Sequence, residues 1–132
     1  FRNRFACFTD SDRGLTDWNT AVDGIVESNI EENGIMYIGG NFQIVGASAP
    51  FGSPVDHTTG IVNINFANPN GPVYSSVADG NGGWYIGGSF TEVGGEPRTR
   101  LAHLDATGQV TSWNPETNGT VRTMLLRNGI LY

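Results

Sequence analysis

Lysine is absent from this chain of 132 residues, so its positive charge comes from arginine alone. Lys and Arg together number 7 against 13 Asp and Glu, and the formal net charge is −6. This balance argues against nucleic acid as a partner, because a surface that follows phosphates needs clustered cations. Long apolar runs are missing too, and no segment approaches the roughly 18 residues that a membrane-spanning helix requires. We therefore expect neither a nucleic-acid partner nor a membrane span.

Cysteine is nearly absent as well, since Cys7 is the single copy and no disulfide can form within the chain. No His–Asp constellation can be assigned to Cys7, so we interpret it as an inert thiol rather than a nucleophile. Scarce cysteine fits a cytosolic protein and equally a bacterial surface protein built from repeats. Cysteine usage therefore leaves the compartment open.

Glycine, by contrast, is abundant at 19 residues, and with frequent asparagine it indicates a turn-rich, all-β protein. The phrase NGIMYIGGNFQIVG at 33–46 recurs as NGGWYIGGSFTEVGG at 81–95, and NGILY begins a third copy at Asn128. Starts at 33, 81 and 128 give a period of 47 to 48 residues. Self-similarity at such a period predicts a repeat architecture.

Matching positions of the three copies carry similar residues. In each copy a valine, a small hydroxyl residue and another aliphatic stand at i, i+2 and i+4, which predicts a strand. The segment GIVESNIEEN, which alone would suggest a helix start, is therefore also expected to be a strand. We further expect the tyrosine after each Asn-Gly turn to occupy an equivalent setting. The columns are Val26, Val73 and Val121; Ser28, Ser75 and Thr123; Ile30, Val77 and Leu125; Asn33, Asn81 and Asn128; and Tyr37, Tyr85 and Tyr132.

One repeat is predicted to contain four short antiparallel strands. The first two, typified by 121–126 and 84–90, flank an Asn-Gly turn of the kind that closes two-residue hairpins. The third and fourth are typified by 100–105 and 110–113. Such a repeat is typical of a β-propeller blade. The expected fold class is thus all-β, a partial β-propeller of four-stranded antiparallel blades with a period of about 48 residues.

The repeat boundaries divide the chain into four parts. Residues 1–23 are expected to be the C-terminal strands of a first blade, 24–70 a second, irregular blade, 71–118 a third, and 119–132 the first strands of a fourth. A propeller needs about four to eight blades to close. We interpret the chain as a fragment of a longer propeller, or alternatively as a small subunit whose copies assemble into a ring.

A glycine pair lies inside the second predicted strand, where glycine normally weakens a strand. Its recurrence predicts a place where another backbone or a large ring comes very close. We expect the pairs to make room for aromatic side chains of the adjacent blade. The pairs are Gly39 with Gly40 and Gly87 with Gly88, and the expected fillers are Trp18, Trp113 and Phe66.

The middle repeat allows two registers. A nearly gapless alignment places PFGSPVDHTTG, at 50–60, opposite RTRLAHLDATG and gives a strand with two prolines. The alternative treats 47–59 as a long surface loop and takes GIVNIN, at 60–65, as the third strand. We favour the alternative, and expect the loop to be a ligand-binding surface through Phe51, Asp56 and His57.

The run YIGGSFTEVGGEPRTRLAHLDATGQVTSWNP, followed by NGTV, resembles the delta-60 repeat family of β-propellers, which also has affinities with kelch repeats. The resemblance covers nearly the whole chain and departs from the pattern at Ala47 and across 50–68. It implies a module of a large secreted or cell-surface protein that acts in adhesion or protein interaction. It implies no catalytic motif that could be carried onto residues of this chain.

Sites that could bind a ligand or metal are few. DSDRG contains Asp10 and Asp12 in the spacing of a calcium loop, but Arg13 interrupts it, and a plain turn is the better interpretation. His57 and His103 lie in non-equivalent places with no Cys, His or carboxylate cluster around them, so no metal or other cofactor is expected. Arg98 and Arg100 match Arg2 and Arg4 of an earlier repeat, which predicts a structural role of binding carbonyls of the preceding loop or an adjacent carboxylate between blades.

The sequence thus predicts a non-catalytic extracellular or cell-surface scaffold for adhesion or protein–protein contact. Its nearest partners would be other blades of the same longer chain, with variable loops presented to a protein or glycan. The alternative is a carbohydrate-binding propeller, in which Phe51 stacks on a sugar. An enzyme with its site at the axial channel is least favoured, because no convergent catalytic set is visible.

Overall fold

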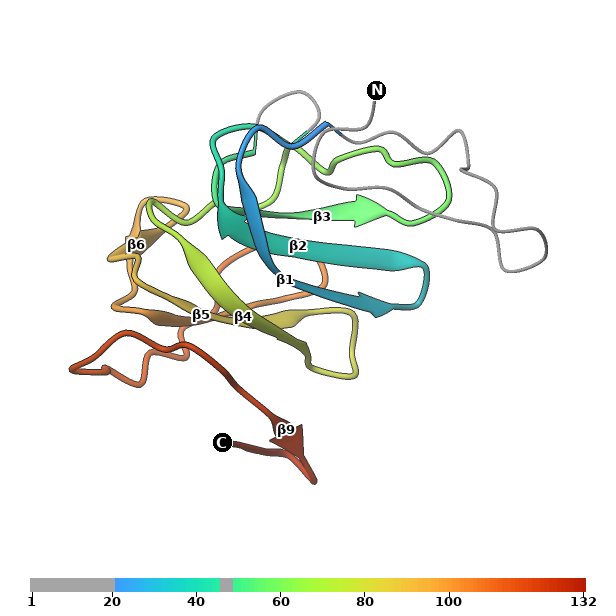
Figure 1. Cartoon of the computed structure of the whole chain (residues 1–132). Coiled ribbons are helices and arrows are strands. Elements are labelled where there is room, and N and C mark those ends of the chain that lie inside the picture. The colour runs from blue at the N-terminus through green and yellow to red at the C-terminus, as the bar shows by residue number, and fades with distance from the viewer. Residues whose placement is uncertain (1–20, 46–48) are drawn as a thin grey trace.

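The computed structural model describes residues 21–45 and 49–132, which form antiparallel strands, hairpins and turns (Figure 1). Expectations for Cys7, Asp10, Asp12, Trp18 and Ala47 fall outside the described residues. No helix in the described part of the chain is long and apolar enough to cross a membrane. The expectation of an all-β protein is confirmed.

Two three-stranded sheets form the body of the molecule. The first has the order β1 (Ile25–Glu32), β2 (Ile35–Asn41) and β3 (Gly52–Asp56). The second has the order β4 (Val73–Ala78), β5 (Trp84–Gly88) and β8 (Leu101–Leu104). Two short hairpins complete the set: β6 (Glu92–Val93) with β7 (Glu96–Pro97), and β9 (Leu126–Arg127) with β10 (Ile130–Leu131).

The first two strands pair in the same register in both sheets, and the same β-bulge interrupts both pairings. Ser28 pairs with Gly39 in the first sheet and Ser75 pairs with Gly87 in the second. Each first strand bulges just before that serine. The segment that resembled a helix start is therefore a strand, as the aligned copies predicted, and the period-two pattern outweighs local helix propensity.

Our choice of register in the middle repeat is wrong. Residues 52–56 form β3, so the nearly gapless alignment holds and 47–59 is not a long loop. Pro54 is tolerated because its carbonyl accepts from the Asn63 N–H on the outer edge, 3.1 Å away. In an extended residue the nitrogen points the same way as the carbonyl, so the missing N–H costs no bond to β2. Phe51 and Arg100 begin the equivalent strands with the same left-handed φ, 65° and 66°.

The predicted fourth strand is reduced to isolated bridges, Val62 with Val55 and Val110 with Leu104. The cause lies in neighbouring side chains that bond the local backbone. The Asn63 side chain accepts from the Asn65 N–H, and the hydroxyl of Thr111 accepts from the N–H two residues later. Such local bonds compete with a ladder and end the strand.

Two of the three Asn-Gly turns form as expected. Asn33 and Asn128 have φ of 52° and 51°, and each is followed by a glycine of positive φ, as a type I′ turn requires. The prediction for Asn81 is wrong, because the positive φ angles there belong to Gly80 and Gly82. That turn is longer, and the Asp79 carboxylate organises it by accepting from the N–H groups of residues 81 and 83.

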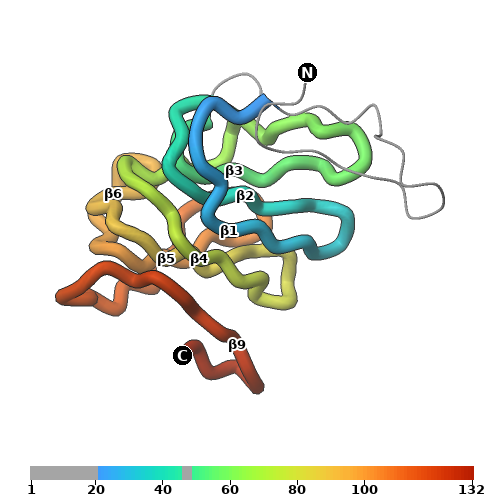
Figure 2. Tube along the Cα trace, in the orientation of Figure 1, coloured from blue at the N-terminus to red at the C-terminus, as the bar shows by residue number. Residues whose placement is uncertain are grey.

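β4 of the second sheet packs across β1 and β2 of the first, so the two sheets are in contact through these three strands (Figure 2). A β-carbon at Gly39 would lie 2.6 Å from the Val73 side chain, and one at Gly87 would lie 2.5 Å from Val121. The glycine pairs therefore permit a close approach, as predicted. Two of the expected fillers are wrong, because valines of the following repeat lie nearest and Phe66 instead packs against Tyr37 and Trp84. Val121, and not Trp113, is nearest to Gly87, and Trp18 lies outside the described residues.

The second glycine of each pair faces backbone rather than a side chain. A β-carbon at Gly40 would collide with the carbonyl oxygen of Ile25, which begins β1, and one at Gly88 with that of Pro72, which directly precedes β4. Hydroxyls also link successive repeats: Ser28 bonds Ser76 at 3.1 Å. In the next repeat the Ser75 hydroxyl accepts from the Met124 N–H at 3.0 Å.

Side-chain burial of the three tyrosines differs, although their backbone positions match. Tyr37 is fully buried in the core between the sheets, against Trp84, while Tyr85 is half-buried and Tyr132 is 69% exposed. The three tyrosines therefore occupy equivalent positions in their hairpins, as expected, but the expectation is wrong for the side chains that surround them. Only Tyr37 has a complete neighbouring sheet packed over it in the described structure.

Replacing Gly40 or Gly88 with alanine should lower the free energy of unfolding by about 2–4 kcal/mol, because the facing carbonyl belongs to backbone and cannot rotate away. Urea denaturation of each variant measures this. Gly119→Ala is the matched control: nothing lies within 4 Å of its β-carbon, and the change should stay within about 0.5 kcal/mol. Equal stability of Gly40→Ala and the control would contradict the close approach.

Candidate functional site

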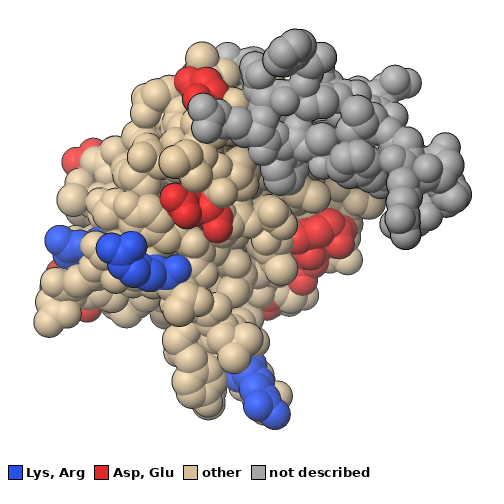
Figure 3. Space-filling model, viewed as in Figure 1, with Lys and Arg blue, Asp and Glu red and all other residues tan. Residues whose placement is uncertain are grey.

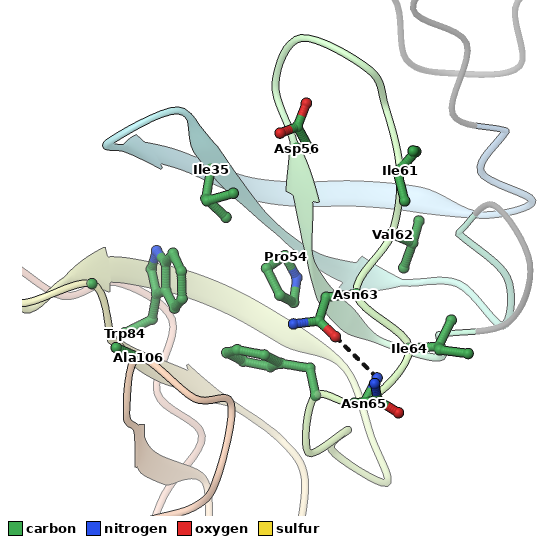
Figure 4. A pocket seen from close by; sticks show the side chains of 12 residues that line it. Ile35, Pro54, Asp56, Ile61, Val62, Asn63, Ile64, Asn65, Trp84 and Ala106 are labelled. Atoms are coloured by element: carbon green, nitrogen blue, oxygen red, sulfur yellow. Dashed lines mark hydrogen bonds between the residues drawn. The ribbon is translucent and has the colours of Figure 1, made fainter.

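A cavity of about 620 Å³ lies between the two sheets, next to β3 and the segment that follows it (Figure 4). Its walls are largely apolar and come from three parts of the chain. Pro54 belongs to β3, Val62 and Phe66 to the segment that follows it, and Trp84 to β5. Residues Gly82 and Ala106 close one side from the turns of the second sheet.

An aromatic cluster forms the floor of this region. The ring of Phe66 lies 5.6 Å from Trp84 in an edge-to-face arrangement and 6.1 Å from Tyr37. Tyr37 and Trp84 are 5.9 Å apart. These three rings are at most 4% exposed, so packing fixes the floor in place.

Two buried polar groups in this cluster have no hydrogen-bond partner among the described residues: the Tyr37 hydroxyl and the Trp84 indole nitrogen. Burial raises the pKa of Tyr37 well above its usual range, so the hydroxyl stays protonated. An unpaired buried donor costs about 1–3 kcal/mol, which favours an acceptor supplied from outside.

Asp56 stands at the end of the cavity wall, where β3 leaves the sheet. One of its oxygens accepts from the N–H groups of Thr58 and Thr59 and from the Thr59 hydroxyl, at 2.7 to 3.0 Å. The bonds from Thr59 hold the pKa of Asp56 below its usual range. The wall therefore carries a fixed negative charge at neutral pH.

A second polar group lies on the second sheet. The His103 imidazole contacts the Asp79 carboxylate through Nε2 at 2.9 Å and the Thr111 hydroxyl through Nδ1 at 3.3 Å. Tyr85 stacks on the imidazole at 4.4 Å, and Trp113 meets Tyr85 edge-on at 5.1 Å. The carboxylate and imidazole side chains are only 10% and 17% exposed, so this is a packed cluster.

The Asp79 carboxylate holds this cluster together through hydrogen bonds to the backbone and to His103. Partial burial alone would raise its pKa, but bonds from the Asn81 N–H, the His103 ring and the Gly83 N–H outweigh burial and lower the pKa. The carboxylate thus links the β4–β5 turn to β8. Its chemistry here is structural, because every bonded group belongs to the fold itself.

The residues that the sequence grouped as a ligand loop are divided by a strand. Phe51 directly precedes β3, and Asp56, five residues on, ends β3 next to His57. Asp56 lines the cavity, Phe51 does not, and the His57 side chain is exposed beside the Gly34 turn. The expected loop is therefore partly a strand, and of the three residues only Asp56 lines the cavity, while their role in ligand binding stays a prediction.

The structural interpretation of the arginine pair is confirmed. Arg98 donates to the Thr111 carbonyl and Arg100 donates to the Thr117 carbonyl at 3.1 Å. Both carbonyls belong to the segment that follows β8 rather than to the preceding loop. No group of three or more His, Cys, Asp or Glu that could hold a metal occurs in the part of the chain that the structure describes.

The sequence missed the residues that matter most at both sites. Trp84 aligns with Met36 and was predicted only as part of a strand, and the sequence analysis assigned no role to Asp79. We found no carboxylate near His103 because Asp79 is distant in the chain and reaches it across β5. An aspartate directly before a glycine-rich turn is the one signal that could have indicated the turn-organising role.

No protein-family model, curated protein or solved structure matches this chain.

Asp79→Ala should lower the free energy of unfolding at pH 7 by about 2 kcal/mol, because two backbone donors and an imidazole lose their buried acceptor. Chemical denaturation measures the change. Asp79→Asn, which keeps one acceptor oxygen, should lose less, and equal losses in the two variants would contradict the proposed role.

The same carboxylate predicts a pH dependence. Because its folded pKa is lowered from 3.8, its contribution is present above the unfolded pKa and is lost as pH falls through the folded value. The stability difference between the natural chain and Asp79→Asn should therefore shrink between about pH 5 and pH 2. Asp56 and Asp105, whose pKa values are also lowered, remain in both proteins and cancel. A difference that stays constant with pH would refute the assignment.

Proposed function

We propose that this chain is a run of β-propeller blades of the delta-60 type, and that it serves as a non-catalytic scaffold for protein–protein contact at the cell surface or outside the cell. The single observation that carries the proposal is the repetition of one stacking contact. Gly39 receives Val73, and Gly87 receives Val121, one repeat later.

The repetition supports a propeller because each repeat uses the same face to accept the next. The valine that follows lies in the first strand of its own repeat, at Val73, or in the equivalent segment, at Val121. Hydroxyl contacts between successive repeats recur at matching positions, 48 and 49 residues apart. A contact in which each unit receives the next in the same way forms a ring when the rotation closes, and a propeller is such a ring of blades.

A scaffold role follows from how the repeats use their polar residues. Arg98, Arg100 and Asp79 all bond groups of the fold itself, which stiffens the frame. The cavity between the two sheets, by contrast, has largely apolar walls. Rigid frames with apolar openings at the boundary between units are common ligand and partner sites.

The carbohydrate-binding alternative depends on an aromatic ring that is available to a sugar. Phe51 is half-buried at the start of β3, where its φ of 65° constrains the backbone. Of the other accessible rings, Tyr85 and Trp113 pack against His103 on the face that also carries Val121, and Arg122 lies over Tyr74. Tyr132 is 69% exposed. Because Phe51, the ring expected to stack on a sugar, is only partly exposed, we favour protein contact over sugar stacking.

The test immobilises the natural chain on beads and measures binding to a panel of extracellular matrix proteins and to a glycan array. We expect retention of at least one protein with a Kd below about 100 μM and no glycan signal above background. Glycan binding that disappears in Phe51→Ala would instead establish the carbohydrate-binding alternative. Silence on both panels would count against a scaffold that acts outside the cell.

A further inference from the structure

The dipeptide Asn-Gly occurs at five places, and all of them lie in the described part of the chain: 33–34, 70–71, 81–82, 118–119 and 128–129. An asparagine followed by glycine can lose its side-chain amide without an enzyme. The glycine has no β-carbon to hinder its nitrogen when that nitrogen attacks the amide carbon. How fast each pair reacts therefore depends on how firmly the fold holds the nitrogen and the amide.

In two of the pairs a carboxylate holds the glycine nitrogen. The Gly34 N–H donates to the Glu31 carboxylate at 2.7 Å. The Gly82 N–H donates to the Glu32 carboxylate at 3.2 Å. A negatively charged acceptor keeps the proton on the nitrogen, and the nitrogen has to lose this proton before it can attack. Both pairs are therefore protected.

In two further pairs the fold holds the asparagine. The Asn70 side-chain oxygen accepts from the N–H groups of Thr91 and Glu92 at 2.9 and 3.0 Å, and its nitrogen donates to the Thr91 hydroxyl at 2.9 Å. Asn128 has a φ of 51° in the tight turn that the pairing of β9 with β10 closes. In both pairs the glycine nitrogen can approach the amide only after these bonds break.

The pair Asn118-Gly119 is held by nothing of this kind. Both residues are exposed, and neither makes a hydrogen bond to the described residues. A β-carbon at Gly119 would have nothing within 4 Å, so the space around the glycine is open. The pair lies in the segment that connects β8 to β9 (Figure 1).

The chain is fixed on both sides of this pair. The Arg100 side chain donates to the Thr117 carbonyl at 3.1 Å. On the other side, the Val121 N–H donates to the Gly88 carbonyl at 3.1 Å, where the next repeat meets the second sheet. Asn118 therefore lies in the short link between two fixed points.

We propose that Asn118 is a modification site, at which the chain converts its own asparagine to aspartate and isoaspartate. The Gly119 nitrogen gives its proton to solvent base and bonds to Cγ of Asn118. The bond from Cγ to the side-chain nitrogen breaks, and that nitrogen leaves as ammonia. Water then adds to one of the two carbonyl carbons of the resulting succinimide ring and opens it. One opening gives aspartate and the other gives isoaspartate, without oxidation or reduction.

The isoaspartate product lengthens the main chain by one methylene group between the two fixed points. The added charge disturbs the structure less, because Arg100 binds the carbonyl of the preceding residue. Basic and acidic side chains also lie in separate places on the face in Figure 3. Isoaspartate, and not aspartate, should therefore loosen the Val121 contact with the second sheet. This inference is independent of the scaffold function.

The experiment incubates the natural chain in mildly alkaline buffer at physiological temperature and follows all five pairs by tandem mass spectrometry. Replacement of the side-chain NH₂ by OH changes the peptide mass, and an isoaspartate-specific methyltransferase distinguishes the two products. We expect Asn118 to react about tenfold or more faster than each other pair, because those pairs must first lose at least one hydrogen bond. In guanidinium chloride the five rates should become similar.

Two variants test the origin of the difference. Glu31→Ala removes the acceptor of the Gly34 N–H and should accelerate Asn33 without changing Asn118. Its matched control is Glu27→Ala, an exposed glutamate of the same strand, which should change neither rate. Gly119→Ala should slow the reaction at Asn118 about tenfold or more, because the new β-carbon hinders the nitrogen.

Hydrogen exchange at the Val121 N–H measures the consequence for the stacking contact. The isoaspartyl form should lose protection at this N–H. Asn118→Asp, which carries the charge without the extra methylene group, should keep it.

Equal rates at all five pairs in the folded chain would overturn the modification site, and so would an unchanged rate in Gly119→Ala. Full protection of the Val121 N–H in the isoaspartyl form would refute the loosening of the contact. Equal loss of protection in Asn118→Asp would assign that loosening to charge, against the argument from chain length.

Discussion

The packing of one repeat onto the next depends on the absence of a side chain at Gly39, and Gly40 makes the same kind of room within its own sheet. At Gly39 the missing β-carbon admits Val73, and at Gly40 it admits the carbonyl of the bulged first strand. Because Val73 begins β4, this single approach fixes where the whole second sheet lies. Burial then adds to it: Tyr37 and Ile86 are fully buried, and each such side chain contributes about 1.5–3 kcal/mol. Without the glycines this core could not close.

The cavity is a consequence of the same contact. The two sheets are in contact at β1, β2 and β4. Because the sheets are twisted, they move apart with distance from this contact, toward β3. The outer strand of the first sheet is followed by a segment that makes only one bridge, so it cannot fill the gap. Phe66 and Trp84 cover the floor, and Ile61 and Ile64 stay at the opening. A site between repeats therefore arises from the stacking itself, without a dedicated loop.

Sequence reasoning succeeded where aligned copies constrained each other and failed where a single residue decided the outcome. The strand at 25–32 was predictable because three copies shared one period. The third strand was mispredicted because proline was judged by type and not by the side of the strand on which its nitrogen lies, which Pro54 shows. The propeller architecture and the four-stranded blade stay predictions. At the candidate site, Asp56 was named for the right region, while Trp84 and Phe66 were assigned no role in a cavity.

The sequence by itself determined the all-β character, the spacing of the hairpins and the need for a close approach at the glycine pairs, because these follow from local periodicity and from the lack of a β-carbon. Only the tertiary structure decided what fills that approach, which tyrosine is buried, and that Asp79 meets His103. The physical reason is that such contacts join residues about 24 to 48 positions apart. Their geometry depends on how two sheets stack, and no local pattern encodes it.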